Sequence, residues 1–521
     1  MPYLEELLKK AKSEVEPTAK VSFIQPTAPQ GSELSPVEDK VLVDQYDEVK
    51  IYKKRGEPLL LYEVPAPRYR GEEKALIDTI LDLAARTIRV DEALFQTGIE
   101  KRAKYMHDVR QLIDGTPELK IPSHAKDFYA SAVVREMMGF GLIDPLIADD
   151  KLEEVMVIGI DRPVYVFHRK YEMMKTNVVF YSDKDVVDLI DKIARNIGRR
   201  IDISSPLLDA RLPDGTRVNA TIPPASLNGS TVTVRKFKAD PLSVIDLVNN
   251  GTINYEVAAF LWTMVEGMGG IPANVIIAGS TASGKTTLLN ILTSFVPNYE
   301  RLITLEDTAE LALPFQHWIR LESRPPGLEG VGEITLDDLL KNSLRMRPDR
   351  IIVGEIRSGE AYTLFSAMNT GHSGSMGTLH ANSARDTMIR LTNPPMSVPV
   401  IMLNALNFIV MMQRTYDRRK GLIRRVSEVA EMIPSDTGEA QPEINGIYKW
   451  NPATDAVEEA NEPAFFLKMI ERYTGMGKAA IKEEIAGRKR FLMDLNERGI
   501  RDLKSVCESM QDYSQKRQGK I

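Results

Sequence analysis

The chain has 521 residues, and a prior of about 150 residues per domain predicts three or four structural units. Hydrophobic residues make up 43% and charged residues 27% of the chain, a balance that excludes a disordered, collagen-like or integral-membrane protein. The net charge of −6 gives no sign of a nucleic-acid binder, and the one cysteine excludes a disulfide framework and a CxxC zinc site, which favours a reducing, intracellular compartment.

Residues 1–55 predict a short helix followed by a flexible tail. Met1–Val15 has the pattern of a charged amphipathic helix and lacks the apolar run of a signal peptide. The rest is polar, contains several prolines and shows no sustained periodicity. Two readings of the helix stay open: it docks on an assembly partner, or it is a frayed end.

Residues 56–238 predict an α+β domain. Helical spacing of apolar residues and strict alternation follow one another along this stretch. We expect strands at Leu59–Glu63, Leu152–Phe167 and Ser230–Phe237, helices at Glu72–Val90, His124–Met138 and Asp183–Asn196, and a hairpin turn at Asp214–Gly215.

Residues 239–251 are polar and contain Pro241 and Gly251, which predicts an interdomain linker. Strand and helix signals alternate over 252–521, as in a mostly parallel sheet with crossover helices, and the last 60 residues predict charged helices. The longest apolar stretch, Val398–Met412, is shorter than the roughly 20 residues that a membrane span needs. It predicts a buried helix and strand, and any work at a membrane would be that of a peripheral protein.

A phosphate-binding loop is the sharpest motif. Gly279-Ser280-Thr281-Ala282-Ser283-Gly284-Lys285-Thr286 matches G-x-x-x-x-G-K-[ST], between a predicted strand at Asn274–Ala278 and a predicted helix at Thr286–Ser294. The glycines let backbone N–H groups face phosphates, and the helix N-terminus adds positive charge. We expect ATP on these residues and Thr287, with Lys285 on the β- and γ-phosphates and Thr286 ligating Mg²⁺.

Two further strands are expected to end in acids at the same site. Arg350–Val353 leads to Glu355, which we predict as the catalytic base that polarises the attacking water and reaches Mg²⁺ through water. Gly354 stands where a metal-bound Asp is usual, and we expect this strand to lie beside the strand of the phosphate-binding loop. Leu302–Leu305 leads to Glu306, Asp307 and Glu310, and we predict a catalytic role for Glu306.

The loop from Gly371 to His380 is rich in Gly and Ser and holds two of the six histidines, His372 and His380. No third ligand is spaced to complete a metal site. We expect a loop that senses the γ-phosphate, with His380 catalytic and His372 in contact with the nucleotide.

With these motifs in order, the chain resembles the superfamily of type II and type IV secretion ATPases. The likeness covers about residues 95–460, with an Asp box at Thr304–Glu310, a Gly-Glu Walker B at Ile351–Glu355 and a His box at Gly371–His380. The segments Leu152–Gly159 and Arg162–Val166 look most like the branch that drives the archaellum, the archaeal flagellum.

The resemblance implies a homo-hexamer of two-domain subunits, in which a PAS-like N-terminal domain and a RecA-like ATPase domain hold the nucleotide between them. It further implies that Arg217 and Arg235 are arginine fingers for the γ-phosphate, with Arg211 as a weaker third candidate. Such a residue is worth about 10³–10⁵ in rate in other NTPases. A polytopic membrane platform protein and other cytoplasmic archaellum components are the implied partners, at the inner face of the cell membrane.

The resemblance therefore implies an ATPase that powers assembly and rotation of the archaellum by MgATP-driven domain closure. A pilus or secretion ATPase shares every catalytic motif and stays open as an alternative. A nucleic-acid translocase is disfavoured because no aromatic and basic stripe is present. A nucleotide-binding scaffold without turnover is the least favoured reading, since the catalytic acid is present.

Overall fold

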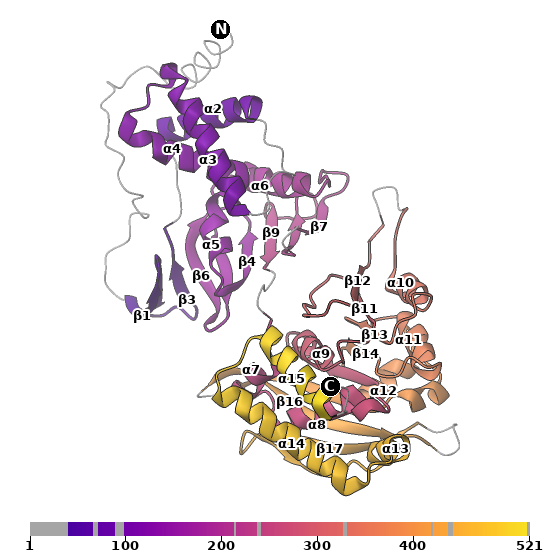
Figure 1. The fold of residues 1–521 in the computed structure, drawn as a ribbon. Coiled ribbons are helices and arrows are strands. Elements are labelled where there is room, and N and C mark those ends of the chain that lie inside the picture. The colour runs from indigo at the N-terminus through magenta and orange to yellow at the C-terminus, as the bar shows by residue number, and fades with distance from the viewer. Residues whose placement is uncertain are drawn as a thin grey trace. The chain divides into compact units, whose positions relative to one another are not determined.

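The computed structural model describes residues 40–65, 71–88, 98–212, 215–236, 241–326, 331–417, 420–435 and 441–517. These residues form two compact units, one within Met1–Phe237 and one within Lys238–Ile521, and each is described here by itself (Figure 1). The predicted helix at Met1–Val15 and the turn residue Asp214 lie outside the described residues. The domain boundaries at 55, 238 and 251 stay predictions.

The N-terminal unit combines one sheet with helices. Its strands are β1 (Lys40–Tyr46), β2 (Val49–Lys54), β3 (Leu60–Glu63), β4 (Leu152–Ile158), β5 (Pro163–His168), β6 (Glu172–Val179), β7 (Leu207–Arg211), β8 (Arg217–Thr221) and β9 (Thr231–Arg235). Its helices are α2 (Gly71–Thr87), α3 (Gly98–Asp114), α4 (Lys126–Met138), α5 (Asp144–Ala148) and α6 (Asp183–Asn196).

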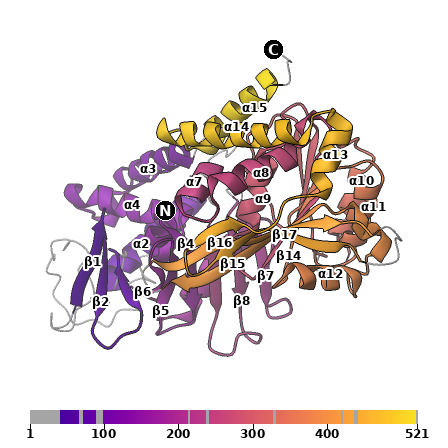
Figure 2. The same cartoon turned by 90° about the horizontal axis from the view of Figure 1, so that it is seen from below.

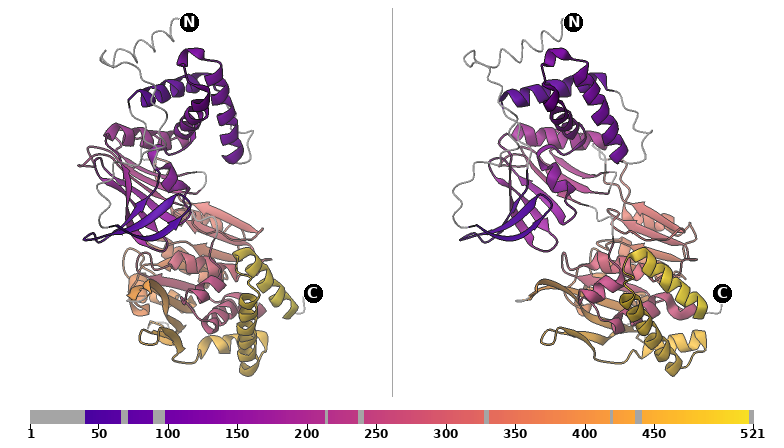
Figure 3. Two further views of the ribbon diagram at one scale, coloured as in Figure 1. Left: turned by 90° about the vertical axis from the view of Figure 1, so that its left-hand side faces the viewer. Right: turned by 60° about the vertical axis from the view of Figure 1, so that its left-hand side comes forward.

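The described strands form a nine-stranded sheet in the order β1-β2-β3-β6-β5-β4-β9-β8-β7, antiparallel except between β3 and β6. Alternating residues such as Val155 and Val166 turn into its core, together with the apolar stripe of α6. Helices α2, α3 and α4 share a separate core around Ile80 and Val133, and they stay together in both views of Figure 3. This arrangement confirms the α+β prediction, while the PAS-like comparison stays a prediction.

One part of the predicted tail is a β-hairpin. Strands β1 and β2 pair from Lys40 opposite Lys54 to Tyr46 opposite Val49. The prediction of an irregular tail up to residue 55 is therefore wrong for this stretch. Val49 and Ile51 are buried in the core of the sheet, and Lys50 between them is exposed, as expected for side chains that alternate between the two faces of a strand.

The C-terminal unit begins with α7 (Val244–Asn249) and alternates strands with helices. Its strands are β10 (Val275–Gly279), β11 (Leu302–Glu306), β12 (Trp318–Glu322), β13 (Arg350–Val353), β14 (Met376–Leu379), β15 (Phe408–Asp417), β16 (Gly421–Ile433), β17 (Glu443–Asn451) and β18 (Ala456–Glu459). Its helices continue with α8 (Tyr255–Glu266), α9 (Lys285–Ser294), α10 (Leu336–Ser343), α11 (Glu360–Asn369), α12 (Ala384–Thr392), α13 (Phe465–Thr474), α14 (Lys478–Glu497) and α15 (Leu503–Arg517).

The described strands of this unit follow the order β12-β11-β13-β14-β10-β15-β16-β17-β18. Pairs from β12 to β15 are parallel and pairs from β15 to β18 are antiparallel. Strands β11, β13, β14, β10 and β15 form a parallel run with helices between them in the sequence, so the predicted α/β fold is confirmed. The expected parallel sheet covers only this part, since the remaining strands return as hairpins.

Part of the predicted linker is a helix of this unit. Ser243 caps α7 by accepting a hydrogen bond from the Asp246 backbone, and Asp246 bonds back to Ser243. Val244, Ile245 and Leu247 are buried in the core of the unit. Polar residues in the predicted linker are thus the cap and the exposed side of a short helix.

The long apolar stretch Val398–Met412 forms a short 3₁₀ helix at Val400–Ala405 and the first half of β15. The strand is buried as predicted, but the helix is not, since Leu403 is its buried residue and Ile401 is 62% exposed. Within the described ranges, no helix is long and apolar enough to cross a membrane.

The C-terminal helices are part of the core of this unit. Helix α14 lies along α8, as Figure 2 shows. Arg488 of α14 pairs with Glu266 of α8, and both side chains are almost fully buried. The Arg488 guanidinium also lies 4.5 Å from the centre of the Trp262 ring. The predicted helical end is therefore anchored by a buried ion pair.

Substituting Arg488 by methionine should destabilise the protein by about 3–5 kcal/mol, because Glu266 would remain as a buried charge without its main partner. Urea-induced unfolding measures this loss. A second substitution, Glu266→Gln, should recover part of it in the Arg488→Met background. The exposed Arg498→Met should cost less than about 0.5 kcal/mol, and an equal loss in that variant would contradict the assignment.

Candidate active site

The phosphate-binding loop lies where β10 ends and α9 begins. Strand β10 is buried along its whole length, and α9 starts at Lys285. The confirmed strand-loop-helix context places the N-terminus of α9 at the carboxyl edge of the sheet. Backbone N–H groups there form an anion-binding cradle.

Two glycines of the loop are required by the backbone. A Cβ atom on Gly279 would lie 2.2 Å from the Met412 carbonyl oxygen of the neighbouring strand β15. Gly284 caps α9 with φ of +96°, a conformation that side chains disfavour. The motif glycines therefore set a close approach between strands and a left-handed turn into the helix.

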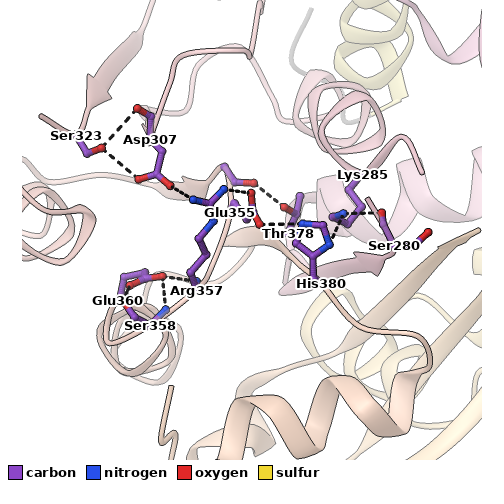
Figure 4. Close-up of polar contacts among 11 residues, drawn as sticks. Ser280, Lys285, Asp307, Ser323, Glu355, Arg357, Ser358, Glu360, Thr378 and His380 are labelled. Atoms are coloured by element: carbon purple, nitrogen blue, oxygen red, sulfur yellow. Dashed lines mark hydrogen bonds and ion pairs between the residues drawn. The ribbon is translucent and has the colours of Figure 1, made fainter. Parts of the chain in front are cut away.

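Lys285, His380 and Glu355 form a continuous polar chain (Figure 4). The Lys285 Nζ atom donates to the Ser280 carbonyl at 2.9 Å and lies 3.3 Å from His380 Nδ1. His380 Nε2 lies 3.1 Å from Glu355 Oε1. Because a lysine ammonium can only donate, Nδ1 is the acceptor and Nε2 carries the proton toward Glu355.

Burial and opposite charges set the protonation of this chain. Burial lowers the pKa of Lys285, and burial together with the Lys285 charge lowers the pKa of His380, which keeps its ring neutral. Burial raises the pKa of Glu355, but the hydrogen bond and charge of Arg357, together with the electrostatic contributions of His380 and Lys285, outweigh it, so that the net shift is downward. Glu355 is thus an ionised carboxylate that can accept a proton.

The strand that leads to Glu355 is not adjacent to β10, contrary to prediction. Strand β14 lies between them, pairing with β10 on one side and β13 on the other. The crossover through α11 places β14 in this gap. His380, which follows β14, therefore bridges the distance between Lys285 and Glu355.

Glu306 is not one of the side chains that link Lys285 through His380 to Glu355. Its Oε1 atom accepts hydrogen bonds from the Glu310 and Leu311 backbone at 2.8 and 2.9 Å, while Oε2 is buried without a hydrogen-bond partner. A Cβ atom on Gly354 would lie 3.0 Å from Glu306 Cγ, so the missing side chain of Gly354 makes room for this acid. Burial raises the pKa of Glu306 to about 7.

Glu306 should make the nucleotide-free protein less stable as the pH rises. Its folded pKa of about 7 exceeds the ordinary value of 4.5, so the folded state binds the extra proton between these values and stability falls through this window. Glu306→Gln should therefore gain about 2 kcal/mol relative to the wild type between pH 5.5 and pH 8. Urea unfolding at both pH values measures this gain. The exposed Glu333→Gln should show the same stability relative to the wild type at the two pH values. The same result for Glu306→Gln would contradict the prediction.

Residues outside the sequence motifs, such as Arg390 and Arg424, also lie at the site. A hollow of about 240 Å³ beside the loop is lined by Gly279, Ser280, Thr281, His380, Ala381, Asn382 and Arg390. Arg390 is exposed on α12, and its charge contributes to the low pKa of His380. Arg424 of β16 donates to the Ala282 carbonyl at 3.0 Å. Both arginines add positive charge where phosphates are expected.

The two histidines of the His box are not brought together. The register pairs Val275 with Met376 and Ala278 with Leu379, so the chain from β14 reaches the phosphate-binding loop only at His380. His372 precedes β14 and lies at the opposite edge, where the adjoining Gly374 closely approaches Arg350. The predicted contact of His372 with the nucleotide stays a prediction.

The candidate arginines of the N-terminal unit form one row. Arg217 of β8 is opposite Arg211 of β7 and also opposite Arg235 of β9. Directly opposed residues lie on one face of a sheet, so the three arginines are neighbours on that face. Arg235 also contacts Glu154 at 3.8 Å. The roles of the three arginines toward a nucleotide stay predictions.

The residues present fit ATP and Mg²⁺. The glycine-supported cradle, the buried Lys285 and the polar hollow suit a polyphosphate. Across the described residues, no group of three or more His, Cys, Asp or Glu side chains is arranged to hold a metal ion. A magnesium ion would thus depend on the Thr286 hydroxyl, phosphate oxygens and water, with Glu355 reaching it through water.

Comparison with known proteins gives a family match and several relatives. Residues 136–440, more than half of the chain, match the family model "Type II/IV secretion system protein". Two uncharacterized proteins of Methanocaldococcus jannaschii are 53% and 35% identical over 49% and 65% of this chain. These matches span 35% and 60% of the relatives' own lengths, less than two thirds of either.

A type IV secretion system protein VirB11 of Bartonella henselae is 30% identical over 48% of this chain and 79% of its own length. Among solved structures, the VirB11 ATPase of the Brucella suis type IV secretion system is 27% identical, with a TM-score of 0.28 over 57% of this chain and 93% of that chain. The pilus retraction motor PilT with bound ADP is 18% identical, with a TM-score of 0.39 over 55% of this chain and 80% of that chain.

Proposed function

The chain belongs to the family of type II/IV secretion system proteins, and from this premise we propose that it hydrolyses MgATP to drive a type IV filament or secretion machine. The observation that carries the proposal is the chain from Lys285 through His380 to Glu355. It joins a phosphate-binding lysine to an ionised carboxylate at the carboxyl edge of one sheet.

Lys285, His380 and Glu355 each have a distinct role in the proposed reaction. Lys285 would leave the Ser280 carbonyl and His380 to neutralise the phosphates. Glu355 would orient the attacking water and accept its proton. Because His380 contacts both side chains, it would transmit the movement of Lys285 to Glu355. When bound, ATP supplies the phosphoryl group and Mg²⁺ shields its negative charge.

The arginine row supports a role for the N-terminal unit in the same reaction. We propose that Arg217 and Arg235, with Arg211 beside them, reach the γ-phosphate when the two domains close. Release after hydrolysis would turn the chemistry into rigid-body motion of the subunits in a homo-hexamer. The ring would act on a polytopic platform protein from the cytoplasmic face of the membrane.

The archaellum is the machine that we propose. The support is the sequence likeness of Leu152–Gly159 and Arg162–Val166 to that branch. A pilus or secretion machine is the second candidate, which the likeness to the type IV secretion system protein VirB11 favours. Both candidates use the same catalytic residues.

Replacing Lys285 by alanine in the source cell separates the two candidates. Loss of swimming and of archaella with thin pili intact, scored by electron microscopy, is the expected result. Loss of pili with swimming retained would assign the protein to the sister machine. No change in either structure would discard both filament assignments.

A further inference from the structure

Arg357 joins two acids at the carboxyl edge of the ATPase sheet (Figure 4). Its Nη2 atom donates to Glu355 Oε2 at 2.7 Å, and its Nη1 atom lies 3.2 Å from Asp307 Oδ2. Because His380 holds the other oxygen of Glu355, both oxygens of the proposed catalytic base have fixed partners. A planar guanidinium suits this geometry, since its two ends face different acids.

Both ends of the bridge are fixed by neighbouring elements. Asp307 follows β11 and accepts a hydrogen bond at 3.2 Å from Ser323 Oγ, which follows β12. The backbone N–H groups of Arg357 and Ser358 both donate to the buried carboxylate of Glu360 at the start of α11. Asp307 therefore provides a firm support for the guanidinium, and Glu360 fixes the backbone from which it extends.

We propose that Arg357 is the positioning residue for Glu355, and that Asp307 acts on ATP hydrolysis only through Arg357. This inference rests on the proposed function. Neither residue lines the hollow beside the phosphate-binding loop, so their effect is on the placement of the base and not on nucleotide binding. The guanidinium is 62% exposed, so its ion pairs contribute little to stability.

A double-mutant cycle tests the inference in the full chain. Arg357→Met should lower kcat for ATP hydrolysis by about 10²-fold, the cost of misplacing a reacting group by about 1 Å, while the Kd of ADP changes less than threefold. Asp307→Asn should lower kcat by a smaller factor. The double variant should match Arg357→Met alone, because the support has no effect once the guanidinium is absent. Arg357→Lys should recover part of the activity, since an ammonium reaches one acid at a time.

The exposed pair Arg498 and Asp494 is a matched control, with the same separation of 3.2 Å and similar exposure. Arg498→Met, Asp494→Asn and their combination should leave kcat unchanged. If the wild type turns over ATP and Arg357→Met has the same kcat, this inference alone is overturned. It is also overturned if the losses of kcat in the two single variants multiply in the double variant. A loss of ADP affinity in Arg357→Met as large as its loss of kcat would overturn it too. Absence of turnover in the wild type, with ADP bound normally, overturns the proposed function instead.

Discussion

Glu355→Gln is expected to lower kcat for ATP hydrolysis by about 10²–10⁴-fold, the contribution of a positioned general base. The amide keeps the size of the carboxylate and can accept the hydrogen bond from His380, but it cannot take a proton from water. Nucleotide binding should therefore be preserved within a few-fold. Steady-state phosphate release and equilibrium binding of ATP measure the two quantities.

Glu333→Gln is the matched control, because Glu333 is exposed in the same unit. It should leave both kcat and the Kd of ATP unchanged. If Glu355→Gln retained the wild-type kcat, the base would be another group, and Glu306 would be the first to test.

Lys285→Ala is expected to weaken ATP binding by about 30-fold or more, as truncation of a buried charge partner costs at least about 2 kcal/mol. Lys285 is only 7% exposed and is the first residue of α9. Its loss removes the one loop side chain that carries positive charge. Fluorescence titration with a labelled ATP analogue measures the Kd.

The exposed Lys341→Ala should bind ATP with the wild-type Kd. Retained affinity in Lys285→Ala would show that the backbone cradle, Arg390 and Arg424 suffice for binding. It would then leave Lys285 with a role in turnover alone.

The sequence predicted the local parts of the site better than their spatial order. The strand-loop-helix unit around Gly279–Lys285 and the strand before Glu355 are encoded within a few residues. The place of β14 depends on a crossover between strands, which local pattern does not specify. This is why the sequence predicts a catalytic role for His380 in a phosphate-sensing loop but not its contacts with both Lys285 and Glu355.

Register decides which residues of a predicted group meet. His372 and His380 are in one loop and strand, yet the parallel pairing of β14 carries only His380 to the site. Conversely, Arg211, Arg217 and Arg235 are separated in the sequence, and antiparallel pairing aligns them across three strands.

The residues missed had weak signals. Arg357 follows Glu355 by two positions and could have been noted as a partner for that acid. Arg390 and Arg424 come from α12 and β16, where no motif marks them, and only the folded sheet brings them to the loop. The hairpin of β1 and β2 did carry a signal, the alternation of Val49 and Ile51 with exposed residues.

A single-turnover experiment tests most directly whether the Lys285–His380–Glu355 site hydrolyses ATP. Wild-type protein and the Glu355→Gln variant are each loaded with radiolabelled ATP and Mg²⁺, and the bound nucleotide is analysed over time. We predict that the wild type converts its bound ATP to ADP while Glu355→Gln retains ATP. Equal rates of ADP formation in the two proteins, or ATP left intact on both, would contradict it.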